Sequence, residues 1–309
     1  MSGRSLSMAL TEYLAVRRSL GFKLTRAELL LRQFVNFCDD SGADRVTAAL
    51  ALDWVCAPAE ASAGWLRMRL TIVRGFASWL QASDPATEVP PLGWLPPYHR
   101  ASPYLYCHDD TAALLEAARR LRPALAAATY ETLFALLAVT GMRVGEAIAL
   151  DRGDLLLDEG LLTITGAKFG KARQLRLHPT TVAALRSYLG SRAALSPNPS
   201  ERALFVQRTG GRVTYRAVRE RFGTLVTLVG LRARSERCRP TIHGLRHSFA
   251  VNTLVRWYQE GADVGARLSE LSTWLGHADP KWTYWYLSAC PELLTLAARR
   301  LEVFCEEQG

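Results

Sequence analysis

Long apolar runs, paired cysteines and lysines are all scarce in this chain of 309 residues. The longest apolar stretches, such as 133–140, stop well short of the roughly 18 to 20 residues that a membrane helix needs. The N-terminal segment has no continuous apolar core ahead of a small-residue cleavage site, which argues against a signal peptide. The six cysteines form no CxxC pair, which argues against a zinc ribbon and a secreted disulfide framework. We therefore expect a cytoplasmic protein without a membrane segment.

Basic residues are in excess, and nearly all of them are arginines. The chain has 38 Lys and Arg residues against 29 Asp and Glu residues, a net charge of +9, and only four of the 38 are lysines. Residues 208–246 hold 10 arginines against Glu220 and Glu236, which gives this stretch a charge of +8. Such a run is often only a solvated face, but it also fits a polyanionic partner such as nucleic acid.

Proline marks the expected domain boundary. Six of the 14 prolines lie within 84–103, a composition that disfavours helices and ladders and predicts an extended tether. We therefore expect an N-terminal domain over 1–84, a linker over 85–103 and a larger domain over 104–309.

The N-terminal part has helical periodicity throughout. Apolar residues near a 3.6-residue period predict a helix over 6–20, and Thr25 with Glu28 fits a capping box before the second helix. Thr47 and Ser62 are expected to cap a short third helix and a longer fourth helix. These signals predict a small four-helix bundle.

The larger part is predicted to be mainly helical with a small sheet. Two strands, 161–165 and 174–177, flank a turn and are typical of a hairpin. Helices are expected near 109–121, 126–140, 143–150, 179–189, 214–229, 243–258, 265–275 and 291–304.

Four short motifs follow one another in this larger part: TGMRVGE at 140–146, GAKFGKAR at 166–173, HGLRH at 243–247 and LGHADPKWTYWY at 275–286. An HxxR match alone is expected about 0.7 times by chance in such a chain, so the ordered conjunction is the informative feature. In this conjunction, and over nearly its whole length, the sequence resembles the tyrosine recombinase (phage integrase) family.

The resemblance implies a fold and a set of site residues. The fold would be an N-terminal helical core-binding (SAM-like) bundle followed by an α+β catalytic domain, mainly α with a small β-sheet. The nucleophile would be Tyr286, and Glu146 would support the site. The other catalytic positions carried over from the motifs are Arg143, Lys168, His243, Arg246 and His277.

These residue types suit displacement at a phosphodiester. A planar, permanently charged guanidinium matches the nonbridging oxygens bidentately, which fits Arg143 and Arg246. A phenol with a pKa of about 10 needs nearby cations and a base, for which His243 is a candidate. Lys168 is expected to protonate the leaving 5′ oxygen, with Lys171 as the rival for that role.

Two local ambiguities remain at the sequence level. Tyr284 lies two residues before Tyr286, so in a helix the two side chains differ by about 200° and only one can face the phosphate; we expect Tyr284 to pack in the core. His243 and His247 form an HxxxH pair that could bind zinc, but no third ligand is placed nearby, so we expect no metal and no cofactor.

Further basic residues are expected to contact DNA. They are Lys171, Arg173, Arg67, Arg69, Arg74, Arg212, Arg216 and Arg219.

The sequence therefore predicts a site-specific DNA recombinase of the integrase or transposase type, which cleaves and rejoins strands through a 3′-phosphotyrosyl bond and a Holliday junction. Its expected partners are double-stranded DNA and three further copies in a homo-tetramer, alone or with sister recombinases, on nucleoid DNA in the cytoplasm. The alternatives are a type IB topoisomerase-like enzyme and a catalytically silent DNA-binding accessory protein.

Overall fold

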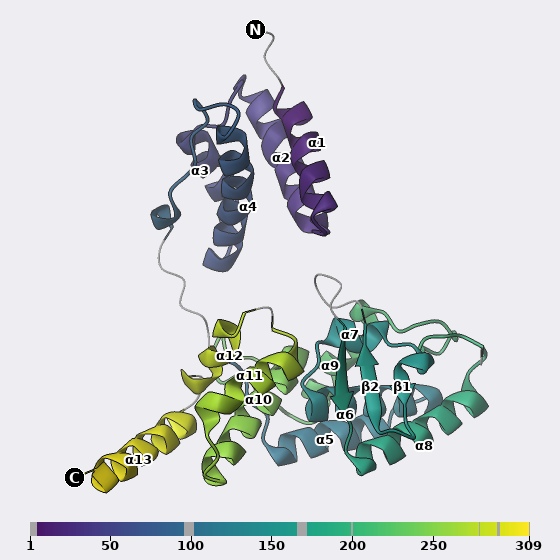
Figure 1. The fold of residues 1–309 in the computed structure, drawn as a ribbon. Coiled ribbons are helices and arrows are strands. Elements are labelled where there is room, and N and C mark those ends of the chain that lie inside the picture. The colour runs from purple at the N-terminus through teal and green to yellow at the C-terminus, as the bar shows by residue number, and fades with distance from the viewer. Residues whose placement is uncertain are drawn as a thin grey trace. The chain divides into compact units, whose positions relative to one another are not determined.

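The chain divides into an N-terminal unit, Met1–Arg100, and a C-terminal unit, Ala101–Gly309. The computed structural model describes residues 5–95, 102–165, 172–198, 200–277, 279–288 and 291–308. Each unit has its own hydrophobic core. Figure 1 traces both units from the N-terminus to the C-terminus.

The N-terminal unit is the expected small helical bundle. Its helices are α1 (Leu6–Ser19), α2 (Thr25–Asp40), α3 (Ala48–Cys56) and α4 (Ala63–Gln81). Leu31, Phe34, Leu70 and Phe76 are fully buried where these helices meet. The apolar faces predicted from the 3.6-residue period thus form one core.

The helix starts in this unit agree only in part with the sequence signals. The predicted caps of α3 and α4 are confirmed, because the side chains of Thr47 and Ser62 accept backbone N–H bonds. The capping box at Thr25 is wrong: Thr25 is already helical, and Leu24 before it has a φ of +49° and no side-chain cap. The Glu28 carboxylate instead accepts hydrogen bonds from two arginines, Arg18 and Arg32.

The proline-rich segment folds onto the N-terminal unit over its described part. The backbone N–H of Glu88 donates to Val46 O at 2.9 Å, and its carboxylate accepts from the N–H of Ala48 at 2.7 Å. The segment continues through the 3₁₀ helix η1 (Leu92–Trp94), and Leu95 is 8% exposed in the core. The expected extended tether is therefore wrong for residues 85–95, because Val89 and Leu95 pack against the core of the N-terminal unit. Residues 96–101 lie outside the described ranges.

The C-terminal unit is built around α6, which packs against α5, α8 and α10. None of its helices, within the ranges described above, is both long and apolar enough to cross a membrane. Figure 1 shows α13 extending from the group formed by α10 to α12. The helices are α5 (His108–Arg119), α6 (Ala124–Thr140), α7 (Val144–Ala149), α8 (Pro179–Leu195), α9 (Tyr215–Leu228), α10 (Ile242–Gln259), α11 (Val264–Leu275), α12 (Lys281–Tyr284) and α13 (Pro291–Gln308).

A three-stranded antiparallel sheet completes this unit, in the order β1 (Leu155–Leu156), β2 (Leu161–Ile164) and β3 (Arg173–Arg176). The predicted hairpin is confirmed, and Leu162 pairs with Leu175 in its register. The short strand β1 was not predicted, because two residues cannot show an alternating pattern. The hairpin tip, with Lys168 and Lys171, lies outside the described residues.

Candidate active site

The ends of two helices form the frame of the site. α6 ends at Thr140 and α11 ends at Leu275, and a glycine follows each of them. The indole Nε1–H of Trp274 donates to Thr140 O at 2.8 Å and ties these ends together. The last carbonyl groups of a helix have no partner within the helix, so these two ends offer acceptors to cationic side chains.

Arg246 on α10 joins the two helix ends. Its guanidinium donates to Gly141 O at 2.7 Å and to Leu275 O at 2.8 Å, and the residue is 2% exposed. Burial lowers the pKa of Arg246 to about 10, and the positive charge of Arg143 acts in the same direction. The guanidinium therefore stays protonated at neutral pH.

Arg143 lies at the start of α7, and its side chain is 40% exposed. Its guanidinium donates to Gly276 O at 3.1 Å and to the Glu146 carboxylate at 2.9 Å. Two guanidinium groups are thus bound to neighbouring carbonyls at one helix end, one of them buried and the other open to solvent.

Glu146 is shared between two arginines, as its position three residues after Arg143 suggested. Its carboxylate accepts hydrogen bonds from Arg143 and, at 2.8 and 3.1 Å, from Arg173 on β3. Burial by itself raises the pKa of Glu146, but the hydrogen bonds from Arg173 and from the Arg143 backbone, with both positive charges, outweigh it and hold that pKa below its ordinary value.

Arg173, which the sequence predicted as a DNA contact, has its hydrogen-bond partners within the protein. Its side chain is 10% exposed, and it donates to Glu146 and to Trp274 O. The hydrogen bonds of Arg173 connect the sheet with α7 and with the end of α11. Its charge is thus balanced by the Glu146 carboxylate within the protein.

The glycines of two motifs have a structural reason. Gly141 and Gly276 have φ values of +62° and +67°, a region that disfavours side chains. A Cβ at Gly276 would come within 2.6 Å of Arg173 Nη1, and one at Gly141 within 2.4 Å of the Phe249 ring. Both glycines let the helix ends approach the arginine and aromatic side chains that hold the site.

His277 and Tyr286 lie against each other. Their rings are nearly parallel, at 14°, with centroids 6.3 Å apart, and His277 Nδ1 lies 2.7 Å from Thr283 Oγ1. Tyr286 is 2% exposed, whereas Tyr284 is 54% exposed. The two tyrosines point in different directions as expected, but the expectation that Tyr284 packs in the core is wrong. Tyr284 ends α12 on the surface, and the 3₁₀ helix η4 (Trp285–Ser288) turns Tyr286 inward.

The two histidines of α10 share one helical face. His243 is exposed and His247 is 8% exposed, and their rings are nearly perpendicular at 4.5 Å. His247 Nδ1 lies 3.0 Å from the phenol oxygen of Tyr286. Over the parts of the chain that the structure describes, no three His, Cys, Asp or Glu side chains cluster as a metal site. Sequence reasoning considered His247 only as half of a zinc pair and missed this contact, which its place beside Arg246 could have signalled.

Of the arginines expected to bind DNA from the N-terminal unit, Arg69 is wrongly assigned. It is 7% exposed, stacks at 3.5 Å on the Trp54 ring and donates to Trp54 O, and burial lowers its pKa. Arg67 and Arg74 on the same helix are half-buried, and Arg67 donates to Leu95 O at 3.4 Å.

Residues 208–246 likewise contain both structural and exposed arginines. Arg212 donates to Ile148 O and Leu150 O at 2.7 and 2.9 Å and pairs with Asp151, so it has a structural role that the sequence did not predict. Its expected contact with DNA stays a prediction. Arg216 and Arg219 on α9 are exposed, and the Arg216 Nε–H donates to the Glu220 carboxylate at 2.7 Å from a side chain that is 88% exposed.

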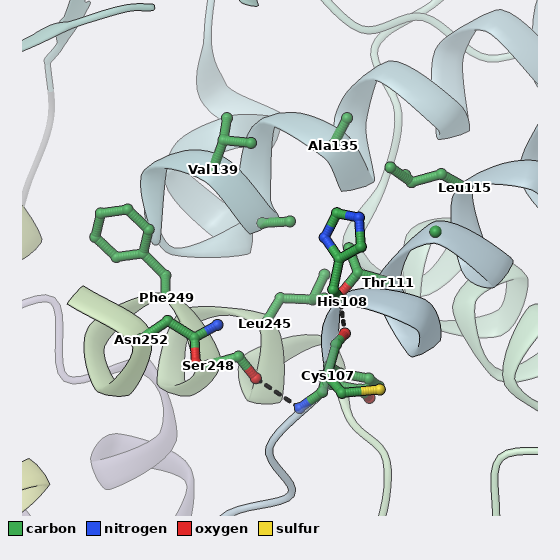
Figure 2. A pocket seen from close by; sticks show the side chains of 13 residues that line it. Cys107, His108, Thr111, Leu115, Ala135, Val139, Leu245, Ser248, Phe249 and Asn252 are labelled. Atoms are coloured by element: carbon green, nitrogen blue, oxygen red, sulfur yellow. Dashed lines mark hydrogen bonds between the residues drawn. The ribbon is translucent and has the colours of Figure 1, made fainter. Parts of the chain in front are cut away.

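A cavity of about 350 Å³ lies between α5, α6 and α10, apart from this site. Figure 2 shows mainly apolar side chains around it, among them Val139, Leu245 and Phe249. The Ser248 hydroxyl at its edge accepts the backbone N–H of Tyr106 at 2.7 Å. None of the catalytic residues described above lines this cavity, so it is not the candidate active site.

Known proteins are similar to this chain in sequence and in fold. The chain is 42% identical over 304 residues to the integrase/recombinase y4rB of Sinorhizobium fredii, covering 95% of this chain and 96% of that one. It is 35% identical over 218 residues to the tyrosine recombinase XerC of Azotobacter vinelandii, covering 70% and 67%.

Two solved structures have the same fold. The XerH recombinase bound to a palindromic difH substrate matches with a TM-score of 0.67 and 20% identity, over 89% of this chain and 78% of that one. The Tn1549 transposon integrase in complex with transposon right end DNA matches with a TM-score of 0.68 and 15% identity, over 96% and 99%. The phage integrase family profile matches residues 106–292. The chain belongs to the phage integrase family, the tyrosine recombinases.

Proposed function

We propose that this protein is a site-specific DNA recombinase that cleaves and rejoins strands with Tyr286 as its nucleophile. The observation that carries the proposal is the convergence at one helix end. Arg246 binds the carbonyl of residue 275, Arg143 binds that of residue 276, and the next residue, His277, stacks on Tyr286. Guanidinium groups, a histidine and a phenol are the groups that attack on a phosphodiester requires.

The arginines act on the phosphate. Arg143 is open to solvent and presents its remaining N–H groups to a nonbridging oxygen, while Arg246 is held rigid by its two carbonyls. A group held in place before the reaction stabilises the developing charge without a cost of reorganisation. His243, exposed at the start of α10, and His277 are proposed to bind the same phosphate, and Lys168 is the expected acid for the leaving 5′ oxygen.

The substrate is duplex DNA, and the assembly is proposed as a homo-tetramer on two DNA sites that a Holliday junction joins. A mixed tetramer with sister recombinases is the alternative assembly. The XerH and Tn1549 integrase complexes with DNA support DNA as the substrate. The exposed Arg216 and Arg219 supply sequence-independent phosphate contacts on α9. We place the reaction on nucleoid DNA in the cytoplasm.

The alternatives find less support. The relatives reported above are integrases and recombinases, which favours strand exchange over a topoisomerase-like role. A silent accessory protein has no need for an intact nucleophile beside two anchored arginines.

A trapping experiment tests the nucleophile. The probe is a pool of duplexes with randomised arms, nicked so that cleavage releases a short strand and leaves the protein attached to the other. Adducts are detected as DNA-shifted protein bands on a denaturing gel, and the trapped strands are sequenced to define the site. Tyr286→Phe removes one oxygen and preserves packing, so we expect it to bind the selected DNA without forming an adduct.

Tyr284→Phe is the matched control, because Tyr284 is exposed and two residues away. It is expected to form adducts at the wild-type rate. Adducts in Tyr286→Phe would contradict the assignment, and so would their loss only in Tyr284→Phe. An adduct-free wild type that still binds selected DNA would favour the accessory protein.

A further inference from the structure

His247, which contacts Tyr286, is not among the catalytic residues predicted from the motifs. His247 Nδ1 lies 3.0 Å from the phenol oxygen, with ring centroids 5.5 Å apart. Both residues are buried, at 8% and 2% exposure. A neutral phenol in this geometry donates its O–H to an unprotonated Nδ1.

Burial restricts where the proton of Tyr286 can go. A phenol with a pKa of about 10 attacks phosphorus efficiently only as its proton leaves, and bulk water has little access to a side chain that is 2% exposed. The acceptor must therefore be a protein group within hydrogen-bond distance. His247 is such a group, and the ordinary pKa of an imidazole suits a base at neutral pH.

His243 lies in a different position relative to the phenol. It is exposed one turn closer to the start of α10, and its ring meets the ring of His247 at 4.5 Å. The start of a helix favours an anion, which fits His243 as a phosphate ligand. His243 thus keeps the phosphate-binding role proposed above, and His247 is the better placed candidate for the base that the sequence had assigned to His243.

We propose that His247 is the base that takes the proton from Tyr286 during strand cleavage; this rests on the proposed function. The bond from the Tyr286 oxygen to phosphorus forms while the bond from phosphorus to the 5′ oxygen breaks. The phenol proton moves to His247 Nδ1, and the leaving 5′ oxygen takes a proton from the acid on its own side. Rejoining reverses each transfer, so His247 returns the proton to the phenol.

The first test replaces His247 by asparagine. The asparagine amide lies close to the position of Nδ1 and can still bond the phenol, but it cannot accept a full proton. We expect His247→Asn to bind the pool-selected DNA as wild type does and to form the covalent adduct about 100-fold more slowly or worse. His178→Asn is the matched control, because His178 caps α8 away from the site and asparagine caps a helix well. It should react as wild type.

The second test separates proton transfer from packing. A fluorinated tyrosine with a lower phenol pKa is installed at position 286 alone, in wild type and in His247→Asn. A phenol that ionises more easily depends less on a base, so the deficit of the asparagine variant is expected to shrink about tenfold or more. A histidine that merely packs against the ring would leave the deficit unchanged. If His247→Asn is too unstable, His247→Gln fills the ring volume instead and is expected to show the same loss and rescue.

The outcomes separate this inference from the proposed function. A wild type that forms no adduct through Tyr286 refutes the proposed function and the inference with it. A wild type that forms the adduct, with a His247→Asn variant that is equally fast or faster, refutes only the base. A slow variant that the fluorinated tyrosine does not rescue also refutes the base.

Discussion

Replacing Arg246 by lysine tests two roles of this arginine, its contribution to the stability of the fold and its contribution to phosphate binding. The guanidinium is 2% exposed and donates to Gly141 O and Leu275 O at 2.7 and 2.8 Å. A lysine ammonium has no fork and reaches one of these carbonyls at most, so the other stays buried without a donor. We expect the free energy of unfolding to fall by about 2 to 4 kcal/mol, the cost of an unsatisfied buried acceptor and a weakened charged bond.

Arg143→Lys is the matched comparison. The Arg143 side chain is 40% exposed, so water can replace its bonds to Gly276 O and Glu146. We expect this variant to lose about 1 kcal/mol or less. Both variants lose the bidentate fork, so each is expected to cleave DNA about 100-fold more slowly, with DNA binding nearly retained.

Urea unfolding followed by circular dichroism measures the stability difference, and adduct formation measures cleavage. In a unit of this size 1 kcal/mol corresponds to roughly 2 to 4 °C in Tm, so Arg246→Lys should melt at least roughly 4 °C lower than wild type. Arg120→Lys, at a side chain that is 75% exposed, should match wild type in both assays. Equal stability of the two site variants would refute the carbonyl anchoring, and wild-type cleavage in either would refute the phosphate role.

The remaining predictions concern salt, backbone and pH. DNA affinity should fall steeply between about 50 and 200 mM salt because residues 208–246 carry most of the excess charge, and a flat dependence would exclude the expected phosphate contacts. Gly276→Ala should destabilise the protein by about 1 to 3 kcal/mol in urea unfolding, because φ is +67° and the new Cβ meets Arg173; Gly223→Ala, in open space on α9, should be neutral or stabilising. The lowered pKa of Glu146 contributes stability that is present above its unfolded pKa and is lost as pH falls through its folded pKa. Glu146→Gln should therefore lose less stability on acidification than wild type in acid titrations followed by circular dichroism. The same dependence of stability on pH in both proteins would contradict the ion pairs.

Local patterns in the sequence determined most of the secondary structure. Helix starts at Thr47 and Ser62, the hairpin strands and the helix ends at Gly141 and Gly276 depend on neighbouring residues, so they can be predicted without the rest of the chain. The motif order likewise indicated the family, because each motif is a short run whose residue types the chemistry demands. Local predictions were wrong where a contact with a more distant residue replaced the local one. Glu28, for example, pairs with Arg18 instead of capping its own helix.

Only the tertiary structure decided what each charged or aromatic side chain does. Every arginine has the same charge in the sequence, yet Arg69 stacks on Trp54, Arg173 clasps Glu146 and Arg216 faces solvent. The contact of His247 with Tyr286 joins residues 39 positions apart, and no local pattern encodes such a distance. Burial and hydrogen-bond partners come from packing between distant segments, so the sequence by itself determined which groups are present and the fold determined which of them meet.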